Sequence, residues 1–582
     1  MFVTYLLVVV LMQFTVLDAA RSSSPTPLKL GVHLFVDNQY LQNTSSLEFQ
    51  NGLIQKNTGD PIVFPEYPWE AAVHFYTSFV QVPANLSVTG KPMYIIYYAC
   101  VASDTIIFFH NVSVCVANST DGVKWEKPML SYFPYTANGT QPAKPTNIVF
   151  VTDINEFLGS VFIDSRPNVP RSEIFKMTYE NEPERYVYVS TSSDGFNWTA
   201  GTARAHPLAG LSDTQTVMLY SPENGGEYVL YGRQNGPSLS NSTVYCPNGG
   251  DAHRRVVITV SNDSIYGLWS KPLEAFPLGA PDPLQCLDNY NPATLYYQGV
   301  YFLFPSAFLH RSEADSGAPI PRAASNDGVM DIRLAVSRTA LGPYNFPSRD
   351  PFISRGVGVI DPTCKLFNAT GSDRDAGFVF SSSSGLLDPD FLQTRLNSLG
   401  DSNNDPSPWV YHMYWGSQTT HAGGGAYLGR YWPGAYSGIF KARVRREGYV
   451  ALSTLRSSAT GQGWLLTEVL SLPKIDSNAA MNATQLQLRL NADVATAGHL
   501  AVQFEDGKTG NPISGYRLED CKTLHGNGVR QLLEWSRQNG TRSNVTYTSD
   551  LTPLTTYSDG IRMRIEMSHT KLYSWLLSYV EE

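Results

Sequence analysis

The chain has 582 residues, of which 42% are hydrophobic, 12% aromatic and 16% charged, and its formal net charge is -9. This mild negative charge, without a basic stripe along the chain, excludes nucleic acid as an expected partner. Low charge together with many tyrosines, phenylalanines, glycines and prolines is typical of an all-β protein with many turns.

The first 20 residues are expected to be a secretory signal peptide. They contain the apolar run Leu6 to Met12 and end in Ala19 and Ala20, small residues of the kind that precede a cleavage site. A membrane anchor is the alternative, but an anchor needs a longer apolar span. Because no later stretch of about 18 residues is uninterruptedly apolar, we expect a secreted or cell-surface protein with no membrane span in the mature chain.

Twelve Asn-x-Ser/Thr sequons predict N-linked glycans on a protein that passes through the secretory pathway. The sequon asparagines are Asn43, Asn85, Asn111, Asn118, Asn138, Asn197, Asn241, Asn262, Asn368, Asn482, Asn539 and Asn544. The six cysteines fit the same oxidising compartment. The expected disulfides are Cys100–Cys115, Cys246–Cys286 and Cys364–Cys521, of which the last would join two domains, although other pairings are possible.

A turn motif recurs at a spacing of roughly 70 residues, which is the strongest architectural signal in the chain. Its copies are Ser119 to Trp125, Ser192 to Trp198 and a degraded Ser261 to Asp263 that leads to Trp269. Asp-Gly gives the turn the backbone freedom that it needs, and Trp covers it. A period that is too long for a solenoid rung, and longer than short propeller repeats, favours a four-stranded propeller blade.

Alternating apolar positions with β-branched or aromatic residues predict five successive units, so we expect a five-bladed β-propeller over residues 21–455. The expected strands are 76–82, 93–101 and 114–118 in blade one, 160–163, 174–179 and 186–190 in blade two, 216–220, 228–231 and 256–260 in blade three, 293–296, 301–304 and 331–337 in blade four, and 363–367, 377–381, 410–414 and 438–443 in blade five. After these units, segments 486–491, 499–504 and 561–567 alternate cleanly, as strands with one solvated face do. We therefore expect a C-terminal β-sandwich over residues 456–582.

A propeller brings the innermost strand of every blade to a central shaft, so residues at the start of the blades should converge in one pocket. Acidic residues at these places are Glu70, Asp164, Asp213 and Asp361. Glycoside hydrolysis needs two carboxyl groups, one to protonate the leaving oxygen and one to attack or to activate water. Several acids in one site would also push their pKa values apart, which separates these roles. Taken singly, an Asp before Pro or Thr is more often a turn former or a cap.

Other residues near these positions suggest a carbohydrate ligand. Arg166 and Arg233 could bind sugar hydroxyls or a carboxylate, or pair with the acids. His310 and His421 fall in expected loops beside the pocket, where a histidine transfers a proton, binds a ligand or is simply exposed. The residues expected to contact the substrate are Trp69, Arg166, Arg233, Tyr290, Asn291, His310, Asp361 and His421. Without a Cys/His cluster at zinc spacing or a Gly-rich loop before a helix, we expect no metal and no cofactor.

Several segments make the chain resemble secreted glycoside-hydrolase-family-32-like proteins. They are Leu34 to Asn38, Pro68 to Glu70, Asp213 to Gln215, Phe304 to Ser306 and the Ser-x-Asp-Gly-x-x-Trp turns. Such proteins belong with the five-bladed propeller superfamily of invertases, fructanases, arabinanases and xylosidases. The resemblance implies three acids, with Glu70 in place of the first acid, Asp164 as transition-state stabiliser and Asp213 as general acid. The Trp-Met-Asn-Asp-Pro signature of invertases and a Glu-Cys acid motif are absent.

The sequence therefore favours a secreted glycoside hydrolase that cleaves a poly- or oligosaccharide with paired carboxylates. A catalytically silent carbohydrate-binding or structural glycoprotein on the same scaffold is the alternative, since a fold does not determine function. The Asp-Gly turns also suggest a sialidase, but five units rather than six, and no Phe/Tyr-Arg-Ile-Pro motif, count against that assignment.

Overall fold

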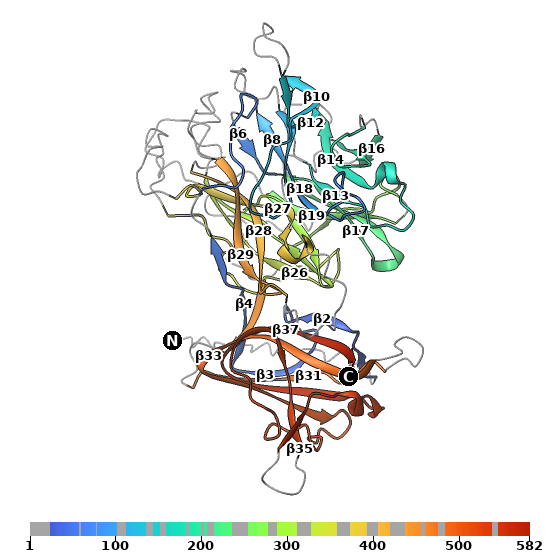
Figure 1. Cartoon of the computed structure of the whole chain (residues 1–582), viewed down its shortest axis with the longest axis vertical. Helices are drawn as coiled ribbons and strands as arrows, with labels where there is room; N and C mark the ends of the chain where they lie inside the picture. Colours follow the sequence, from blue (N-terminus) through green and yellow to red (C-terminus); the bar gives the residue numbers. More distant parts are fainter. Residues whose placement is uncertain are drawn as a thin grey trace, which may run out of the picture.

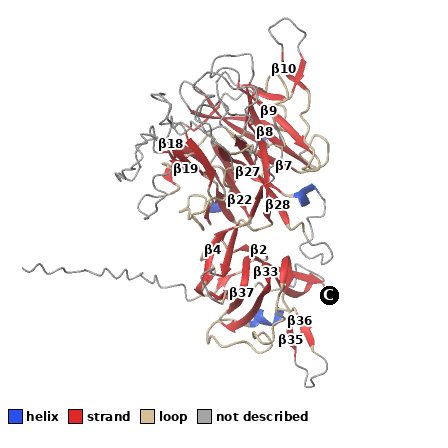
Figure 2. Cartoon of the chain, turned by 90° about the vertical axis from the view of Figure 1, so that its left-hand side faces the viewer, coloured by secondary structure: helices blue, strands red, loops and turns tan. Residues whose placement is uncertain are grey.

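The computed structural model of the chain shows two domains built almost entirely from β-strands, with only short helical turns (Figures 1 and 2). It describes residues 24–56, 60–70, 72–76, 78–101, 112–135, 144–151, 159–181, 186–199, 203–206, 215–235, 254–262, 264–276, 288–310, 328–357, 373–392, 406–418, 437–454, 460–474, 483–537 and 545–581. The expected signal peptide lies outside these residues and stays a prediction. Within them, no helix is long and apolar enough to cross a membrane.

Antiparallel sheets form the first three blades of the propeller. From the inside outward, blade one contains β6 (Ala72–His74) with β7 (Phe79–Val82), β8 (Met93–Val101), β9 (Val112–Ser119) and β12 (Ile148–Val151), and carries the hairpin β10 (Leu130–Tyr135) and β11 (Lys144–Thr146). Blade two contains β13 (Val161–Ile163), β14 (Phe175–Asn181), β15 (Tyr186–Ser192) and β16 (Ala203–His206). Blade three contains β17 (Val217–Ser221), β18 (Glu227–Asn235), β19 (Arg254–Ser261) and β20 (Leu273–Glu274).

Blades four and five share hydrogen bonds through one parallel bridge between β25 and β27. Blade four contains β21 (Asp288–Asn289) with β22 (Thr294–Tyr297), β23 (Val300–Leu303) with β24 (Ser306–His310), and β25 (Gly328–Ile332) with β26 (Ala335–Ser337). Blade five contains β27 (Phe378–Leu387), β28 (Trp409–Ser417), β29 (Ser437–Arg445) and β5 (Ile54–Lys56). Every expected strand overlaps a described one, except that segment 363–367 lies outside the described residues. The strands of the propeller that were not expected are β5, β6, β10, β11, β12, β16, β20, β21 and β24.

The innermost strands surround one axis and contact one another through small polar side chains. Ser78 of blade one forms a parallel bridge with Ser383 of blade five, and its hydroxyl accepts a hydrogen bond from the Val161 N–H of blade two (2.9 Å). The hydroxyl of Ser160 accepts in the same way from the Met218 N–H of blade three (3.2 Å). The five-bladed propeller expected from the turn repeat is therefore confirmed.

A strand from the beginning of the chain closes the ring. β5 pairs antiparallel with β29, so that Lys56 lies opposite Ala442 and Ile54 lies opposite Val444. The Lys56 ammonium also forms an ion pair with the buried Asp375 carboxylate of blade five (2.6 Å). The outermost strand of the last blade is thus supplied by the opposite end of the domain, which ties the first and last parts of the propeller together.

The repeated turns have the expected construction. In the second copy, Asp194 Oδ1 accepts from the N–H groups of Phe196 (2.8 Å) and Asn197 (2.9 Å), and Ser192 Oγ accepts from the Gly195 N–H (2.9 Å). The first copy repeats these bonds with nearly the same lengths. Gly195 has φ +82°, a left-handed conformation that favours glycine. The buried Trp198 ring covers the turn and donates Nε1–H to the Gly195 carbonyl (3.2 Å).

The second domain combines both ends of the chain in one ten-stranded sheet. Its strands are β1 (Thr26–Pro27), β2 (Gly31–Leu34), β3 (Leu41–Ser45), β4 (Leu47–Asn51), β30 (Val450–Thr454), β31 (Gln462–Thr467), β32 (Leu470–Ser471), β33 (Ala483–Asp506), β34 (Gly526–Leu532) and β37 (Ile561–Glu581), beside the small pair β35 (Trp535–Arg537) and β36 (Thr546–Thr548). Alternate residues of β33 and β37 enter one core that also holds Trp535 and Trp575. The two-sheet sandwich expected here stays a prediction, because the hydrogen bonds join all ten strands.

The domain boundaries differ from the expected ones at residues 21 and 455. Strands β1 to β4 pair with β30, β31, β32 and β37, so the segment before β5 belongs to the second domain rather than to the propeller. β30 pairs with β4 and β37 as well. The long-range pairing of the N-terminal segment is not visible in local alternation, which is why the sequence pattern assigned it to the propeller.

Two consecutive arginines connect the domains where β29 ends. Arg445 Nε donates to the Asn491 side-chain oxygen of β33 (2.6 Å). Arg446 turns back to the propeller and donates to both carboxylate oxygens of Asp388 (2.6 Å each). Because both guanidinium groups are buried, the end of the propeller at which β29 finishes is held against the second domain.

One of the three expected disulfides is present among the described residues. Cys100 and Cys115 form it between β8 and β9, 15 positions apart in the sequence. Cys521 is a buried free thiol, so the expected bond from Cys364 to Cys521 is not formed. Cys364, Cys246 and Cys286 lie outside the described residues, and the pairing of the last two stays a prediction.

Candidate functional site

The two ends of the propeller differ in their relation to the second domain. β27 and β29 run in the same direction, since both are antiparallel to β28, and β29 ends at Arg445 against the second domain. Ser78 of blade one forms a parallel bridge with Ser383 of β27, so these innermost strands both begin at the end of the propeller far from the second domain. We call the end where they begin the distal end and the end beside the second domain the proximal end.

A group of side chains at the distal end, the axial cluster, has members from all five blades. They are His74 and Tyr76 of blade one, Glu180 of blade two, Gln215, Arg233 and Arg254 of blade three, Tyr290 and Asn291 of blade four, and Phe380 and Trp415 of blade five. Strand register explains why these side chains lie at the same height along the propeller axis. Val217 opposes Tyr231, so Arg233 lies two residues further toward the distal end, at the level of Gln215. In the same way Met177 opposes Val161, which brings Glu180 to the distal end of blade two.

Amide and hydroxyl groups connect blades two to five in the axial cluster. The Thr216 hydroxyl donates to Glu180 Oε1 (3.4 Å), which joins blade three to blade two. Asn291 Nδ2 donates to Gln215 Oε1 (3.2 Å) and to the Ser381 carbonyl (3.4 Å), so this one amide joins blades three, four and five. Asn291 and Gln215 are completely buried, so their amides fix the relative positions of the blades around the axis.

Aromatic rings complete the axial cluster across blades four, five and one. Trp415 stacks on Phe380 with a centroid distance of 5.2 Å, and the ring of Tyr76 meets its edge at 5.1 Å. Tyr290 contacts Phe380 at 5.5 Å. His74 lies 4.9 Å from Trp415, and burial lowers the pKa of His74 to about 4, so its imidazole is neutral at physiological pH.

Two arginines of blade three stack against Tyr290 of blade four. The Arg233 guanidinium carbon is 4.6 Å from the centre of the Tyr290 ring, and that of Arg254 is 4.9 Å away. Arg254 also lies over Phe308 at 5.1 Å. Such cation–π contacts hold the planar guanidinium groups in place and contribute most where water is excluded.

Residual exposure separates two layers in the axial cluster. Surface remains on Tyr76 (9%), Tyr290 and Arg254 (7% each), Glu180 (6%) and Trp415 (4%), whereas Gln215, Asn291 and Arg233 have at most 1%. The first layer could therefore touch a ligand, and the second layer positions it. Aromatic rings stack on the apolar faces of sugars, and carboxylate and guanidinium groups bind hydroxyls, so this combination suits a carbohydrate.

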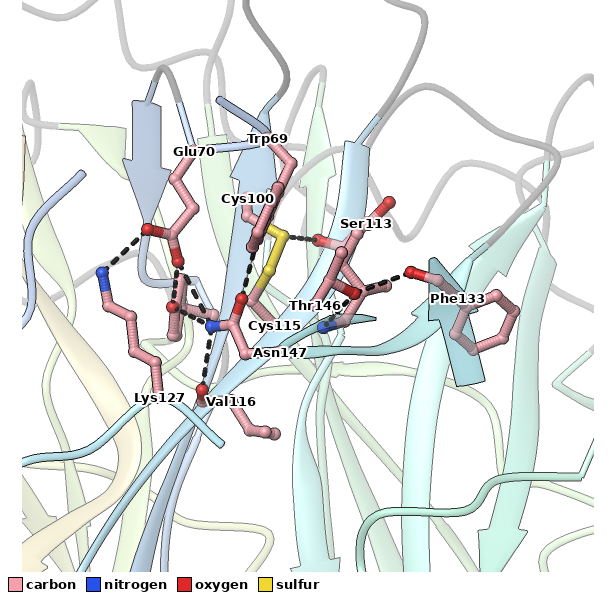
Figure 3. Close-up of a disulfide and its surroundings, with 12 residues drawn as sticks. Trp69, Glu70, Cys100, Ser113, Cys115, Val116, Lys127, Phe133, Thr146 and Asn147 are labelled. Atoms are coloured by element: carbon pink, nitrogen blue, oxygen red, sulfur yellow. Dashed lines mark hydrogen bonds and ion pairs between the residues drawn. A yellow bond between two sulfur atoms is a disulfide. The ribbon is translucent and has the colours of Figure 1, made fainter. Parts of the chain in front are cut away.

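The expected catalytic Glu70 lies on the sheet of blade one, outside the axial cluster (Figure 3). Its Oε1 accepts from the Tyr98 hydroxyl (2.5 Å) and Asn147 Nδ2 (3.2 Å). Its Oε2 accepts from Lys127 Nζ (2.8 Å) and from the Glu66 N–H (3.1 Å). A carboxylate offers about four lone-pair sites, so these four donors use its capacity, and the group is fully buried.

Trp69 belongs to the same network and packs against blade one, where its ring contacts Tyr135. Its Nε1–H donates to Asn147 Oδ1 (2.8 Å), and its ring stacks on Tyr67 at 4.8 Å. The Cys100–Cys115 disulfide is part of the same close-up (Figure 3). These contacts make Trp69 a core residue of the propeller, and its expected role in stacking on a sugar stays a prediction.

The expected catalytic Asp164 lies at the proximal end, because it follows β13 rather than preceding it. Its Oδ2 accepts from the Tyr228 hydroxyl (2.6 Å) and forms an ion pair with Lys176 (3.0 Å), while Oδ1 accepts from the Arg166 N–H (3.0 Å). The Arg166 guanidinium lies over the Tyr228 ring at 5.4 Å. Asp164 and Lys176 are both buried, so this cluster joins blades two and three internally.

The structure thus brings together some of the expected site residues and separates others. Arg233, Tyr290 and Asn291 meet in the axial cluster, whereas Glu70 and Asp164 belong to two networks that share no residue. Their catalytic roles stay predictions. Asp213, Asp361 and His421 lie outside the described residues, as does the side chain of His310. The described part of the chain contains no group of three or more His, Cys, Asp or Glu side chains placed to hold a metal ion.

Sequence reasoning missed Glu180, Arg254 and Tyr76. Glu180 comes directly after an expected second strand of a blade, and antiparallel pairing brings the end of a second strand to the level at which the first strand begins. Considering only residues that precede inner strands therefore overlooks half of the distal end. Applied to Asp164, which follows an inner strand, strand direction would have excluded this residue from the distal end.

No protein-family model matches the chain, and no curated protein matches it. Solved structures give distant likenesses. A thermostable family-43 glycoside hydrolase is 15% identical with a TM-score of 0.34, covering 66% of this chain and 94% of its own. An N-acetylgalactosamine deacetylase from F. plautii is 14% identical with a TM-score of 0.40, covering 70% and 97%. The α-L-arabinofuranosidase PaAbf62A from Podospora anserina is 13% identical with a TM-score of 0.35, covering 68% and 98%. These scores are low, so a function for this chain has to be inferred from its own residues.

Proposed function

We propose that this chain is a secreted, carbohydrate-active protein of the glycoside hydrolase kind, which binds its glycan at the axial cluster. The observation that carries the proposal is the convergence of side chains from all five blades at the distal end. Tyr76, Tyr290 and Trp415 supply aromatic surfaces, and Glu180 and Arg254 supply polar groups that retain exposure. Ligand sites of this kind combine a largely apolar wall with a few convergent polar groups.

Hydrolysis requires a second carboxyl group beside Glu180. In the proposal Asp213 supplies it, because Asp213 precedes Gln215 of the axial cluster by two positions in the sequence. The family resemblance implies a different set, in which Glu70 and Asp164 act together with Asp213. Glu70 and Asp164 each already bind a lysine in a buried network, which favours structural roles for both.

The test is hydrolysis of a panel of aryl glycosides and fructans by the purified full-length protein and its variants. Glu180→Gln and Asp213→Asn should each lower the rate by about 100- to 10,000-fold, as loss of an acid or base group does. Glu534→Gln, which removes a carboxylate of an exposed ion pair in the second domain, is the control and should leave the rate unchanged. Loss of activity after Glu70→Gln and Asp164→Asn but not after Glu180→Gln, in proteins that stay folded, would instead support the set of acids that the resemblance implies.

A silent carbohydrate-binding protein is the second candidate. It is favoured by the neutralisation of Glu70 and Asp164 by Lys127 and Lys176. A glycan array together with the hydrolysis panel separates the two functions, because the silent protein would bind sugars without hydrolysing any of them. Trp415→Ala should reduce binding in both cases, since it removes the aromatic surface of blade five.

Secretion with N-glycosylation is also part of the proposal. The disulfide between Cys100 and Cys115 suits an oxidising compartment. The sequon asparagines whose side chains are exposed are Asn43, Asn85, Asn197 and Asn262. Expression in a eukaryotic secretory host should yield protein in the medium whose mass falls on treatment with peptide N-glycosidase. Protein that stays in the cells without glycans would contradict this assignment.

A further inference from the structure

The turn from β17 to β18 places a buried carboxylate between blades three and four. β17 begins two residues after Gln215 of the axial cluster, so this turn lies at the opposite, proximal end of the propeller. Glu227 is the first residue of β18 and lies opposite Ser221, the last residue of β17. Residues that oppose each other share a face of the sheet, and so do residues two apart in one strand. Val229 packs in one core with Tyr301 of blade four. Glu227 and Ser221 therefore face that blade as well.

Glu227 differs from Glu70 and Asp164 in its surroundings. Each of those two buried carboxylates forms an ion pair with a lysine. Glu227 is also buried, with 3% exposure, but no lysine or arginine of the described residues forms an ion pair with it. Its Oε2 accepts a long hydrogen bond from Asn224 Nδ2 (3.5 Å), and no donor of the described part of the chain reaches its Oε1. A buried carboxylate oxygen without a donor or a cation is costly, so this group favours a partner from outside the chain.

A second carboxylate stands in the same turn. Glu223 Oε2 accepts from the Ala340 N–H of blade four (3.1 Å), so this side chain also points toward blade four. Burial raises the pKa of Glu227, and the negative charge of Glu223 raises it further. No lysine or arginine in the described ranges forms an ion pair with Glu223 either. Two carboxylates that repel each other, one of them buried, favour a cation bound between them.

The donor atoms around this pair narrow the kind of cation. Besides the two carboxylates they include the amide oxygen of Asn224 and the Ser221 hydroxyl, which accepts from the Glu223 N–H (3.1 Å). Such oxygen ligands suit Ca²⁺ and Mg²⁺ rather than zinc or copper. Ca²⁺ takes about six to eight oxygens in a flexible geometry, whereas Mg²⁺ demands a near-ideal octahedron, so mixed donors on a turn favour Ca²⁺. Because the described residues contain no group of three acidic, histidine or cysteine ligands, neutral oxygens have to complete a site built on two carboxylates.

We propose that Glu227 and Glu223 bind a Ca²⁺ ion, which holds the turn between β17 and β18 against blade four. The ion supplies the positive charge that lysines supply to Glu70 and Asp164. Asn224 is exposed, so the ion can enter from solvent at the edge of the turn. This site does not depend on the proposed function, because the axial cluster lies at the other end of the propeller.

Calorimetric titration of Ca²⁺ into the full-length protein, after removal of metal with EDTA, tests the site. We expect binding with a Kd of about 10⁻⁴–10⁻³ M, the range of extracellular calcium modules. Glu227→Gln and Glu223→Gln should each weaken binding by at least about 100-fold, since even residues that only support metal ligands contribute about 10- to 100-fold. Glu126→Gln is the matched control, because it removes a carboxylate of an exposed ion pair in blade one, and it should bind as the wild type does.

Thermal unfolding gives a second readout and shows whether the variants fold. In EDTA, Glu227→Gln should melt no lower than the wild type, because an amide replaces an uncompensated charge. In saturating Ca²⁺ the wild type should melt at a higher temperature than this variant, because only the wild type binds the ion.

Several results would overturn the proposed calcium site. Wild-type protein that binds no Ca²⁺, and melts at the same temperature with and without it, would make Glu227 a buried acid without a ligand. Binding that survives both substitutions unchanged would place the ion elsewhere in the molecule. Tighter binding of Mg²⁺ than of Ca²⁺ would refute the identity of the ion.

Discussion

The ion pair of Asp164 and Lys176 allows a structural role to be separated from a catalytic one. The two charged atoms are 3.0 Å apart, and their side chains are 0% and 1% exposed. At an effective dielectric constant of about 20, Coulomb's law gives this pair an attraction of roughly 5–6 kcal/mol. Removing one partner leaves the other buried and uncompensated, which typically costs about 3–5 kcal/mol. We therefore expect Asp164→Asn and Lys176→Met each to lower the free energy of unfolding by about this amount.

The double variant supplies the decisive measurement. If the two groups stabilise each other, Asp164→Asn combined with Lys176→Met should cost less than the sum of the single changes, with a coupling of about 2–3 kcal/mol. Urea unfolding followed by tryptophan fluorescence gives the three free energies, and the glycosidase panel gives the activities. Additive losses would refute the pairing. A stable Asp164→Asn variant without activity would refute the structural interpretation and return Asp164 to the catalytic site.

Three further predictions test the scaffold. Replacing Cys100 and Cys115 by Ser opens a loop of 15 positions and should cost about 3 kcal/mol, measured as a lower melting temperature; an unchanged melting temperature would contradict a stabilising role of this disulfide. Lys56→Met removes the ion pair with Asp375 that holds the closing strand and should cost about 1–2 kcal/mol, with faster hydrogen exchange in β5; unchanged exchange would contradict the closing role. Burial lowers the pKa of His412 from the ordinary value of 6.5 to about 3. Below pH 6.5 the unfolded chain therefore takes up a proton that the folded protein does not, so the free energy of unfolding falls as the pH is lowered from 6.5 toward 3. His412→Gln should accordingly flatten the acid limb of the unfolding curve, and an unchanged limb would contradict this.

The expected strands of the propeller were predictable because each of them carries a local signal. Alternation marked β8 and β18, and the Asp-Gly turns marked the ends of β9 and β15. The closing strand β5 was not predictable in this way. Its residue Gln55 contacts Arg443, which is 388 positions away in the sequence, and a strand of three residues has no periodicity of its own. The candidate site was partly predictable. Tyr290 and Asn291 open their blade, but Asp164 follows its strand, and only strand direction distinguishes these two cases.

The distribution of charged groups argues for a division between support and function in this propeller. Glu70 forms an ion pair with Lys127, and Asp164 forms one with Lys176. Both carboxylates belong to buried networks in which side chains and backbone groups of the chain itself donate the hydrogen bonds. Such networks fix geometry and leave nothing for a ligand to bind. The distal end is different, because Arg254 and Glu180 come from separate blades and both retain exposure. The proximal end is held by the second domain through Arg445, so the distal end is the one from which a glycan can approach the axis.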